Sequence, residues 1–269
     1  IDKIIDVDLA MTGNAKKVIS QINKELKTVN FDNSKFDGWM KKAMQWRLEH
    51  GLNHNMLDKK NESDIILPQQ VIQSVYKATD GKAFVTSDVG QHQMFAAQYY
   101  HFNEPRKWIN SGGLGTMGFG LPAAMGVKFA FPDETVACIT GEGSIQMCIQ
   151  ELSTCGQYGL PIKIINLNNR ALGMVKQWQD MQYGGRYSSI SYEDSLPDFI
   201  KLAESYGHVG IKVEKLSDLE AAMEECFALK DKLVFLDVYV DPDEHVYPML
   251  KPNGDMSEMF LSKTEKTFE

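Results

Sequence analysis

Apolar and polar positions follow two different patterns along this chain, and the change between them separates its front from its main part. From residue 65 on, short unbroken apolar runs alternate with longer amphipathic stretches. Unbroken runs of about four to eight apolar residues are typical of strands covered on both faces, and amphipathic stretches are typical of the covering helices. The predicted fold class is therefore α/β, a doubly wound parallel sheet with helices on both faces.

The expected elements alternate along this main part. Strands are predicted at 82–88, 135–140, 161–167, 208–213 and 233–240. Helices are predicted to begin at Pro68, Gln91, Thr116, Ser144, Ala171, Pro197 and Asp218. Every predicted strand is thus separated from the next by a helical stretch, as a parallel sheet requires.

The front of the chain carries two amphipathic stretches that are too small to be a domain. Residues 12–29 place Val18, Ile22 and Leu26 on one helical face, and residues 33–50 form a second helical stretch. A polar connection follows them. We therefore divide the chain into a front segment 1–30, a linker with a helix 31–64, a main domain 65–245 and a C-terminal tail 246–269.

The charge balance argues against nucleic acid and membranes as partners. The net charge is -8 and the sequence pI is about 5.3, so no basic field is expected to attract phosphate backbones or anionic lipids. No apolar run in the sequence approaches the roughly 20 residues of a membrane span. The cysteines show no C-x-x-C pairing, which favours a reduced compartment, and we expect a cytoplasmic protein. Because the chain starts with neither a Met nor a signal peptide, we expect a fragment or a processed piece.

A glycine motif raises the question of a dinucleotide. Gly113, Gly115 and Gly118 spell G-x-G-x-x-G, the fingerprint of a dinucleotide-binding turn. NAD binding also needs an acidic residue about 20 positions later, at the carboxyl end of a strand. Asp133 and Glu134 have about that spacing, but they precede the next strand and so lie at its amino end. The sequence therefore disfavours NAD.

Oxygen-bearing side chains follow two other predicted strands. Glu142 stands between two glycines after the strand at 135–140, and Asn168 and Asn169 close the strand at 161–167. Alone, each group is explained by an ordinary turn or a helix cap. At neighbouring strand ends they meet at one edge of the sheet, and Mg²⁺ prefers oxygen ligands that it shares with phosphates. Together they favour a metal-bridged diphosphate.

These residues resemble the thiamine diphosphate (ThDP) signature, which normally reads G-D-G, a spacer and then N-N. Longer motifs resemble the catalytic large subunit of acetolactate synthase, namely D-V-G-Q-H-Q-M-F-A-A-Q, S-G-G-L-G-T-M-G-F-G-L-P-A-A, G-M-V-K-Q-W-Q and H-V-Y-P-M. The resemblance runs from residue 65 to the end of the chain. It implies that residues 1–30 are a remnant of the family's central domain and that residues 65–245 are the ThDP diphosphate-binding domain.

The resemblance also implies a role for each matching residue. Mg²⁺ would be held by the side chains of Glu142 and Asn169 and by the carbonyl of Ala171. ThDP would be bound by Gln91, His92, Gly115, Met117, Gly141, Gly143, Ser144 and Met174. The substrate pocket would be lined by Val175 and Trp178. Without the family pattern, His92 is more typical of a structural histidine, and the Met, Val and Trp residues are typical of a helix face in the core.

Glu142 departs from the family pattern, in which this residue is an aspartate. Its extra methylene extends the carboxylate by roughly 1.5 Å, judged from single-bond lengths. Magnesium tolerates little distortion of its ligand geometry. We therefore expect Glu142 to weaken or retune magnesium binding.

The implied activity is that of a transferase of branched-chain amino acid biosynthesis. It decarboxylates pyruvate and joins the remaining unit to a second 2-keto acid, giving 2-acetolactate or 2-aceto-2-hydroxybutyrate. The family's activating glutamate lies on an N-terminal domain of the partner subunit, so we assign no catalytic residue in this chain and expect the isolated chain to be inactive. The resemblance further implies FAD in the full-length enzyme, a homodimer or higher homo-oligomer, and a small regulatory subunit.

Two other functions remain open at this stage. One is a related ThDP decarboxylase or carboligase of the pyruvate oxidase or glyoxylate carboligase type, against which G-M-V-K-Q-W argues. The other is a non-catalytic fragment with the ThDP-binding fold. Cofactor binding separates the second from the enzymes, and product analysis separates the enzymes from one another.

Overall fold

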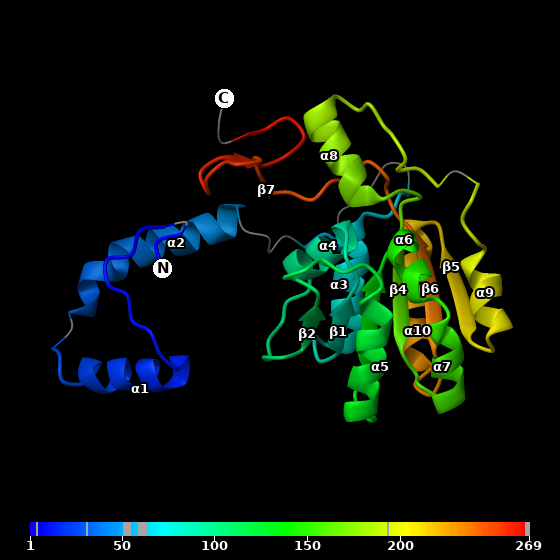
Figure 1. Ribbon diagram of the computed structural model, residues 1–269, viewed down its shortest axis with the longest axis horizontal. Helices are drawn as coiled ribbons and strands as arrows, with labels where there is room; N and C mark the ends of the chain where they lie inside the picture. Colours follow the sequence, from blue (N-terminus) through cyan, green and yellow to red (C-terminus); the bar gives the residue numbers. More distant parts are fainter. Residues whose placement is uncertain (4, 31, 51–54, 59–63, 193, 267–269) are drawn as a thin grey trace. The chain divides into compact units, whose positions relative to one another are not determined.

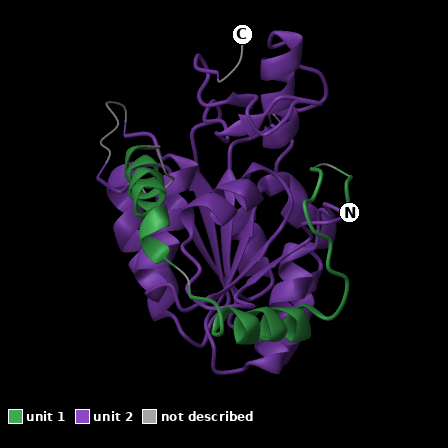
Figure 2. Ribbon diagram, turned by 90° about the vertical axis from the view of Figure 1, so that its left-hand side faces the viewer, with its two compact units in different colours: residues 1–53 green, residues 54–269 purple. Residues whose placement is uncertain are grey.

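The computed structural model describes residues 1–266 except residues 4, 31, 51–54, 59–63 and 193. The chain forms two compact units, residues 1–53 and residues 54–269 (Figures 1 and 2). The polar connection predicted before residue 65 lies largely outside the described residues. The proposed origin of the front segment in another domain stays a prediction.

The first unit contains the two helical stretches predicted at the front. Helix α1 spans Ala15–Leu26, and the side chain of Asn14 caps it by accepting a hydrogen bond from the backbone N–H of Lys17. A 3-10 turn η1, Asn33–Phe36, leads into helix α2, Asp37–His50. No side chain of α1 is buried, so this helix has an apolar face without a described cover.

The second unit is built on a six-stranded sheet whose strands run in the order β2-β1-β3-β4-β6-β5. All its strand pairs are parallel, which confirms the predicted fold class. The strand bounds are β1 Phe84–Ser87, β2 Trp108–Asn110, β3 Val136–Thr140, β4 Lys163–Asn168, β5 Val209–Val213 and β6 Val234–Tyr239. Strand β2 was not predicted, because three half-buried residues at a sheet edge leave too short a pattern.

Helices cover both faces of this sheet (Figure 1). Their bounds are α3 Pro68–Thr79, α4 Gln91–Tyr99, α5 Gly120–Ala130, α6 Glu142–Ile145, α7 Glu151–Tyr158, α8 Gly173–Tyr183, α9 Phe199–Ser205 and α10 Leu216–Ala228, with a 3-10 turn η2 at Gln146–Cys148. One core cluster joins α5, α7 and α9 to the strands, and it includes Leu121, Leu152 and Phe199. Phe199 stacks on Phe235 of β6 with ring centroids 5.4 Å apart.

Five predicted helix starts are displaced: the helices predicted from Thr116, Ser144, Ala171, Pro197 and Asp218 begin at Gly120, Glu142, Gly173, Phe199 and Leu216. The helix predicted from Thr116 begins only at Gly120, because Gly115 and Gly118 adopt left-handed φ values of 64° and 87°, which an α-helix cannot include. The helix predicted from Ser144 begins earlier, at Glu142. The C-terminal tail also contains a small antiparallel pair, β7 Met249–Leu250 and β8 Met259–Phe260.

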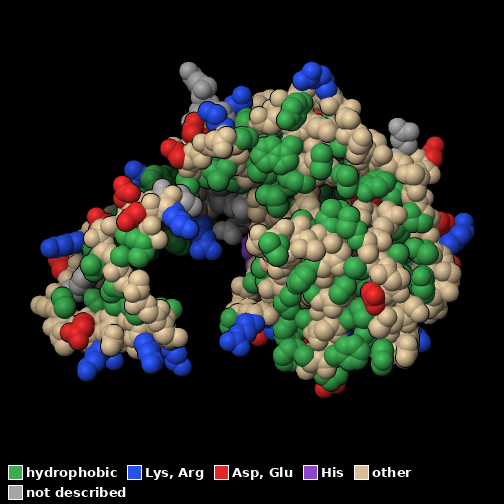
Figure 3. Space-filling model, viewed as in Figure 1, with side chains coloured by type: hydrophobic (Ala, Val, Ile, Leu, Met, Phe, Trp, Pro, Cys, Tyr) green, Lys and Arg blue, Asp and Glu red, His purple; other side chains and the backbone are tan. Residues whose placement is uncertain are grey.

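Apolar side chains are exposed on the helices of the second unit. Phe129 of α5 and Tyr158 of α7 pack edge to face at 5.4 Å, although they are 55% and 57% exposed. Figure 3 shows hydrophobic side chains gathered over this part of the molecule. Among the described residues, no helix is both long enough and apolar enough to cross a membrane.

The strand order determines where a ligand is expected. From β1 the chain proceeds to β2 on one side, and the later strand β3 is added on the other side of β1. The crevice between β1 and β3, at their carboxyl ends, is therefore the switch point at which doubly wound sheets bind their ligands. The loops that follow β1, β3 and β4 carry most of the residues assigned from the sequence.

Candidate functional site

A cavity of about 320 Å³ opens at the carboxyl ends of β1, β3 and β4. It brings together twelve of the residues assigned from the sequence: Gln91, His92, Gly115, Met117, Gly141, Glu142, Gly143, Ser144, Asn169, Ala171, Met174 and Val175. Trp178, assigned to the substrate pocket, does not line this cavity. It lies one turn further along α8 and is half-buried. Its role stays a prediction.

The predicted metal ligands lie next to one another. The backbone N–H of Ala171 donates to Oε1 of Glu142 at 2.7 Å and to Oδ1 of Asn169 at 3.1 Å. The three residues thus gather a carboxylate, an amide oxygen and a backbone carbonyl at neighbouring strand ends, which is the oxygen donor set that Mg²⁺ prefers. No group of three His, Cys, Asp or Glu residues suited to a metal occurs in the described ranges.

Glu142 is 1% exposed at the start of α6. Burial raises the pKa of its carboxyl to about 7, and the nearby carboxylate of Asp237 also raises it. Backbone hydrogen bonds, including that from Ala171, oppose this shift. A buried carboxylate with little positive charge around it is a natural partner for a cation. The hydrogen bond from Ala171 shows that the Glu142 side chain reaches the loop that carries the other two predicted ligands.

His92 fits between two glycines at the inner end of the cavity. A Cβ atom on Gly90 or Gly141 would lie 2.8 Å from the imidazole ring, so both positions need glycine for this close approach. The ring is 8% exposed, and burial lowers the pKa of His92 to about 3, which keeps the imidazole neutral. In the described part of the chain, Nε2 of His92 has no hydrogen-bond partner. A polar group of a ligand in the cavity would be a partner for it.

Asp88, which the sequence analysis did not single out, holds the glycine loop to the sheet. It is fully buried after β1, and its carboxylate accepts hydrogen bonds from the backbone N–H of Gly118 at 2.6 Å and from the Thr140 hydroxyl at 3.1 Å. Burial raises the pKa of Asp88 despite these hydrogen bonds. The loop containing Gly115 and Met117 is thereby fixed at the mouth of the cavity. Asp88 could have been found from the sequence, because it is an acidic residue directly after a buried strand.

The residues after Gly141 are tied to the loop after β1. The hydroxyl of Ser144 donates to the carbonyl of Val89 at 2.8 Å, which ties α6 to the loop after β1. A Cβ atom on Gly143 would lie 2.3 Å from the Tyr192 hydroxyl oxygen, so glycine is needed there as well. The contribution of backbone N–H groups of Gly143 and Ser144 to phosphate binding stays a prediction.

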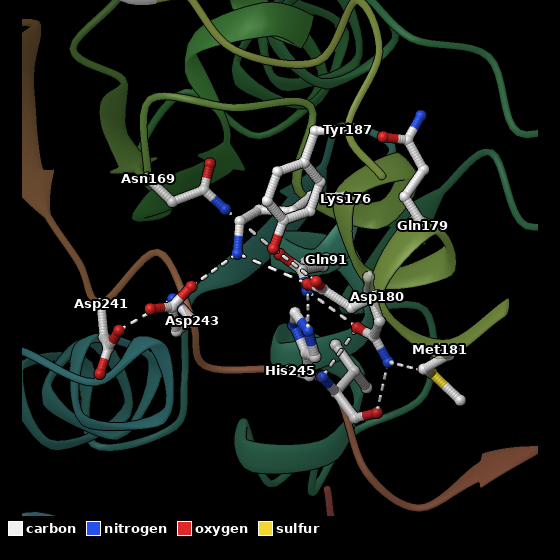
Figure 4. A network of polar contacts seen from close by, with 12 residues as sticks. Gln91, Asn169, Lys176, Gln179, Asp180, Met181, Tyr187, Asp241, Asp243 and His245 are labelled. Carbon is white, nitrogen blue, oxygen red and sulfur yellow. Dashed lines mark hydrogen bonds and ion pairs between the residues drawn. The ribbon is translucent and has the colours of Figure 1, made fainter. Parts of the chain in front are cut away.

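A polar network joins α8 to the C-terminal segment 241–247 (Figure 4). Lys176 forms an ion pair with Asp243 at 2.6 Å, and Asp180 accepts from His245 at 2.8 Å and from the Tyr187 hydroxyl at 2.5 Å. The sequence analysis quoted H-V-Y-P-M as a motif but assigned none of these residues. The network holds the helix that carries Met174 and Val175 against the cavity.

The comparison with protein families identifies the main domain. The family described as "Thiamine pyrophosphate enzyme, C-terminal TPP binding domain" matches residues 88–238. The chain belongs to this family. The match begins directly after β1 and includes β2 to β5, all but the last residue of β6, and the loops after β1, β3 and β4 that line the cavity.

Similar proteins agree with the resemblance seen in the motifs. The chain is 54% identical to an acetolactate synthase large subunit of Haemophilus influenzae and 53% identical to the acetolactate synthase isozyme 3 large subunit of Escherichia coli, in each case over 99% of this chain. It is 37% identical to an acetolactate synthase large subunit of Corynebacterium glutamicum over 96% of this chain. These alignments cover 46%, 46% and 41% of the relatives, so the chain spans about half the length of the curated relatives it matches. The predicted family resemblance is confirmed.

Proposed function

We propose that this chain is the ThDP- and magnesium-binding part of an enzyme that forms 2-acetolactate or 2-aceto-2-hydroxybutyrate from 2-keto acids. The observation that carries the proposal is the cavity at the switch point, where the predicted metal ligands and the predicted cofactor contacts lie together. Relatives more than 50% identical over nearly the whole chain are named acetolactate synthases, which favours this reaction over that of other ThDP enzymes.

The residues of the cavity divide into two groups by chemistry. Glu142, Asn169 and the carbonyl of Ala171 would hold Mg²⁺, which neutralises the buried carboxylate and the diphosphate together. His92 would lie beside the diphosphate, and Gln91 lies beside it at the first turn of α4, where backbone N–H groups favour anions. The glycines leave room for the phosphates to approach the backbone.

Part of the cavity wall is apolar. Met117, Met174 and Val175 line it, and their side chains offer no hydrogen bonds to water. When bound, ThDP supplies the electron sink for decarboxylation and carbon–carbon bond formation. The protein would contribute orientation of the cofactor and exclusion of water from the apolar side. Val175 and Trp178 on α8 would select between the methyl group of pyruvate and the ethyl group of 2-ketobutyrate.

Further partners are proposed on other grounds. The name "large subunit" carried by the relatives favours a smaller regulatory subunit, and the exposed apolar side chains of α5 and α7 favour a homodimer or a higher homo-oligomer. FAD in the full-length enzyme and a cytoplasmic location are proposed from the family resemblance. No residue of this chain is assigned to FAD.

Calorimetric titration of the chain with ThDP in the presence of Mg²⁺ tests the binding part of the proposal. We expect binding that depends on Mg²⁺ and is strongly weakened by Asn169→Ala. The matched control is Asn103→Ala, which removes an exposed asparagine outside the cavity and should leave binding unchanged. Equal binding by both variants would contradict the assignment of Asn169.

Product analysis with the full-length protein tests the reaction. Pyruvate alone should yield 2-acetolactate, and pyruvate with 2-ketobutyrate should also yield 2-aceto-2-hydroxybutyrate. Acetyl phosphate or tartronate semialdehyde as the product would instead indicate the pyruvate oxidase or glyoxylate carboligase type. Cofactor binding without any product would favour the non-catalytic alternative.

A further inference from the structure

A chain of side-chain amides leads from Asn169 to the backbone of the C-terminal segment. Nδ2 of Asn169 donates to Oε1 of Gln91 at 3.2 Å, and Nε2 of Gln91 donates to Oε1 of Gln177 at 2.8 Å. Gln177 in turn pairs twice with Val246, because its Nε2 donates to the carbonyl and its Oε1 accepts from the backbone N–H, both at 2.9 Å. Figure 4 shows Gln91 and Asn169 within the surrounding network.

The donor-to-acceptor direction of this row of amides is determined at Val246. A carboxamide has a donor nitrogen and an acceptor oxygen, whereas the backbone of Val246 offers one N–H and one carbonyl in fixed positions. Only one orientation of Gln177 satisfies both, and it turns Oε1 toward Gln91. Gln91 must then present its nitrogen to Gln177 and its oxygen to Asn169. Asn169 consequently presents its nitrogen to Gln91.

The other end of the Asn169 amide is therefore also determined. Its Oδ1 faces the loop of the predicted metal ligands, where it accepts from the N–H of Ala171 at 3.1 Å. A flipped amide would place a donor NH₂ group toward the metal, and a donor cannot be a ligand. The orientation of one carboxamide thus decides whether Asn169 can bind Mg²⁺.

Burial makes the orientation strict. Gln177 and Val246 are fully buried, Gln91 is 5% exposed and Asn169 is half-buried, so water does not replace a hydrogen bond lost at Gln177. A reversed amide at any position would set two donors or two acceptors against each other, and buried polar groups without partners are strongly disfavoured. The pairing with Val246 therefore propagates through Gln91 to Asn169.

We propose that Gln177 is a positioning residue for the metal site, which fixes the amide orientation of Gln91 and thereby turns Oδ1 of Asn169 toward the metal. This inference rests on the proposed function, because it assumes that Asn169 is a magnesium ligand. It assigns to the C-terminal segment a part in metal binding although none of its residues lines the cavity among those described.

The test compares two variants that loosen the same helix in different ways. Gln177→Met keeps a similar length but removes every hydrogen bond of the amide, so Gln91 is free to turn its amide and Asn169 is held only by its contact with Ala171. The matched control, Asp180→Asn, weakens the contacts of α8 with His245 and Tyr187 but leaves the amide chain intact. The measurement is Mg²⁺-dependent ThDP affinity by calorimetry, with thermal unfolding as a check that each variant folds.

Gln177→Met should lower the affinity about tenfold, the size of one lost hydrogen bond, and Asp180→Asn should change it less than about twofold. An equal loss in both variants, or no loss in Gln177→Met, overturns the proposal. A failure of the unmodified chain to bind ThDP with Mg²⁺ overturns the proposed function instead, and the positioning role with it.

A second comparison separates positioning from loss of packing. Aspartate at position 169 has two equivalent oxygens, so it needs no fixed orientation. Adding Asn169→Asp to Gln177→Met should therefore restore most of the lost affinity. Lost packing around Gln177 would be unaffected by this change. A double variant that binds no better than Gln177→Met overturns the positioning role.

Discussion

Alanine at position 173 is expected to damage the site without unfolding the protein. Gly173 opens α8, and a Cβ atom there would lie 2.2 Å from Oε1 of Gln91 and 2.5 Å from Nδ2 of Asn169. These two atoms form the 3.2 Å hydrogen bond that orients Asn169. Because both clashing atoms end flexible side chains, the side chains can swing into the cavity, and the backbone need not move.

The expected loss of ThDP affinity follows from the interactions that cofactor binding would have to restore. The lost hydrogen bond is worth about 0.5 to 1.5 kcal/mol, and pushing both groups back against the new methyl group costs about 1 to 3 kcal/mol. At about 1.4 kcal/mol for each factor of ten, Mg²⁺-dependent ThDP affinity should fall at least about tenfold. The free energy of unfolding should change much less, since alanine is favoured over glycine in helices by up to about 1 kcal/mol.

Calorimetry and denaturant unfolding of the same preparations measure the two quantities. The matched control is Gly126→Ala on α5, where an added Cβ atom meets nothing within 4 Å. This control should raise the free energy of unfolding by about 0.5 to 1 kcal/mol and leave ThDP affinity unchanged. Gly173→Ala with unchanged affinity would refute the account of Gln91 and Asn169 given above.

Three further substitutions test other parts of the structure. Glu142→Asp should tighten Mg²⁺-dependent ThDP binding and reduce tolerance of Ca²⁺, because the shorter side chain suits the rigid magnesium geometry. Equal or weaker binding by calorimetry would mean that the loop is adapted to glutamate. Trp178→Leu in the full-length enzyme should lower the preference for 2-ketobutyrate over pyruvate about tenfold, as measured by the ratio of the two products. An unchanged product ratio with lower stability would indicate that Trp178 is a core residue and does not select the substrate. Gly210→Ala should lower the free energy of unfolding by about 1 to 3 kcal/mol, because the new Cβ would lie 3.0 Å from backbone atoms of Ile200; an unchanged denaturation midpoint would contradict this packing.

The sequence predicted the parts of the fold that depend on long apolar patterns. Strands β3, β4 and β6 were found because both of their faces are buried, which leaves unbroken apolar runs. Strand β2 and the β7–β8 pair were missed because they are short and half-exposed. Their pairing depends on neighbours that are distant in sequence, and no local pattern records it.

The candidate site was predictable to a different extent. Motif resemblance located the residues that line the cavity, because they stand at strand ends in a recognisable order. It did not find Asp88 or Gln177, which act through other residues. Asp88 at least follows a buried strand directly. Gln177 lies inside a motif that was interpreted as substrate-binding, and only the contact with Val246 reveals its orientation.

The order of strands in the sheet also bears on how the protein folds. β1, β3 and β4 are neighbours in space, yet the contacting residues Gln91 and Asn169 are 78 positions apart in the chain. Such distant contacts form slowly, and the cavity is complete only when all three strands have paired. A cofactor that binds there has no partial site to recognise on the way to the native state. It should therefore slow unfolding while leaving the rate of folding unchanged.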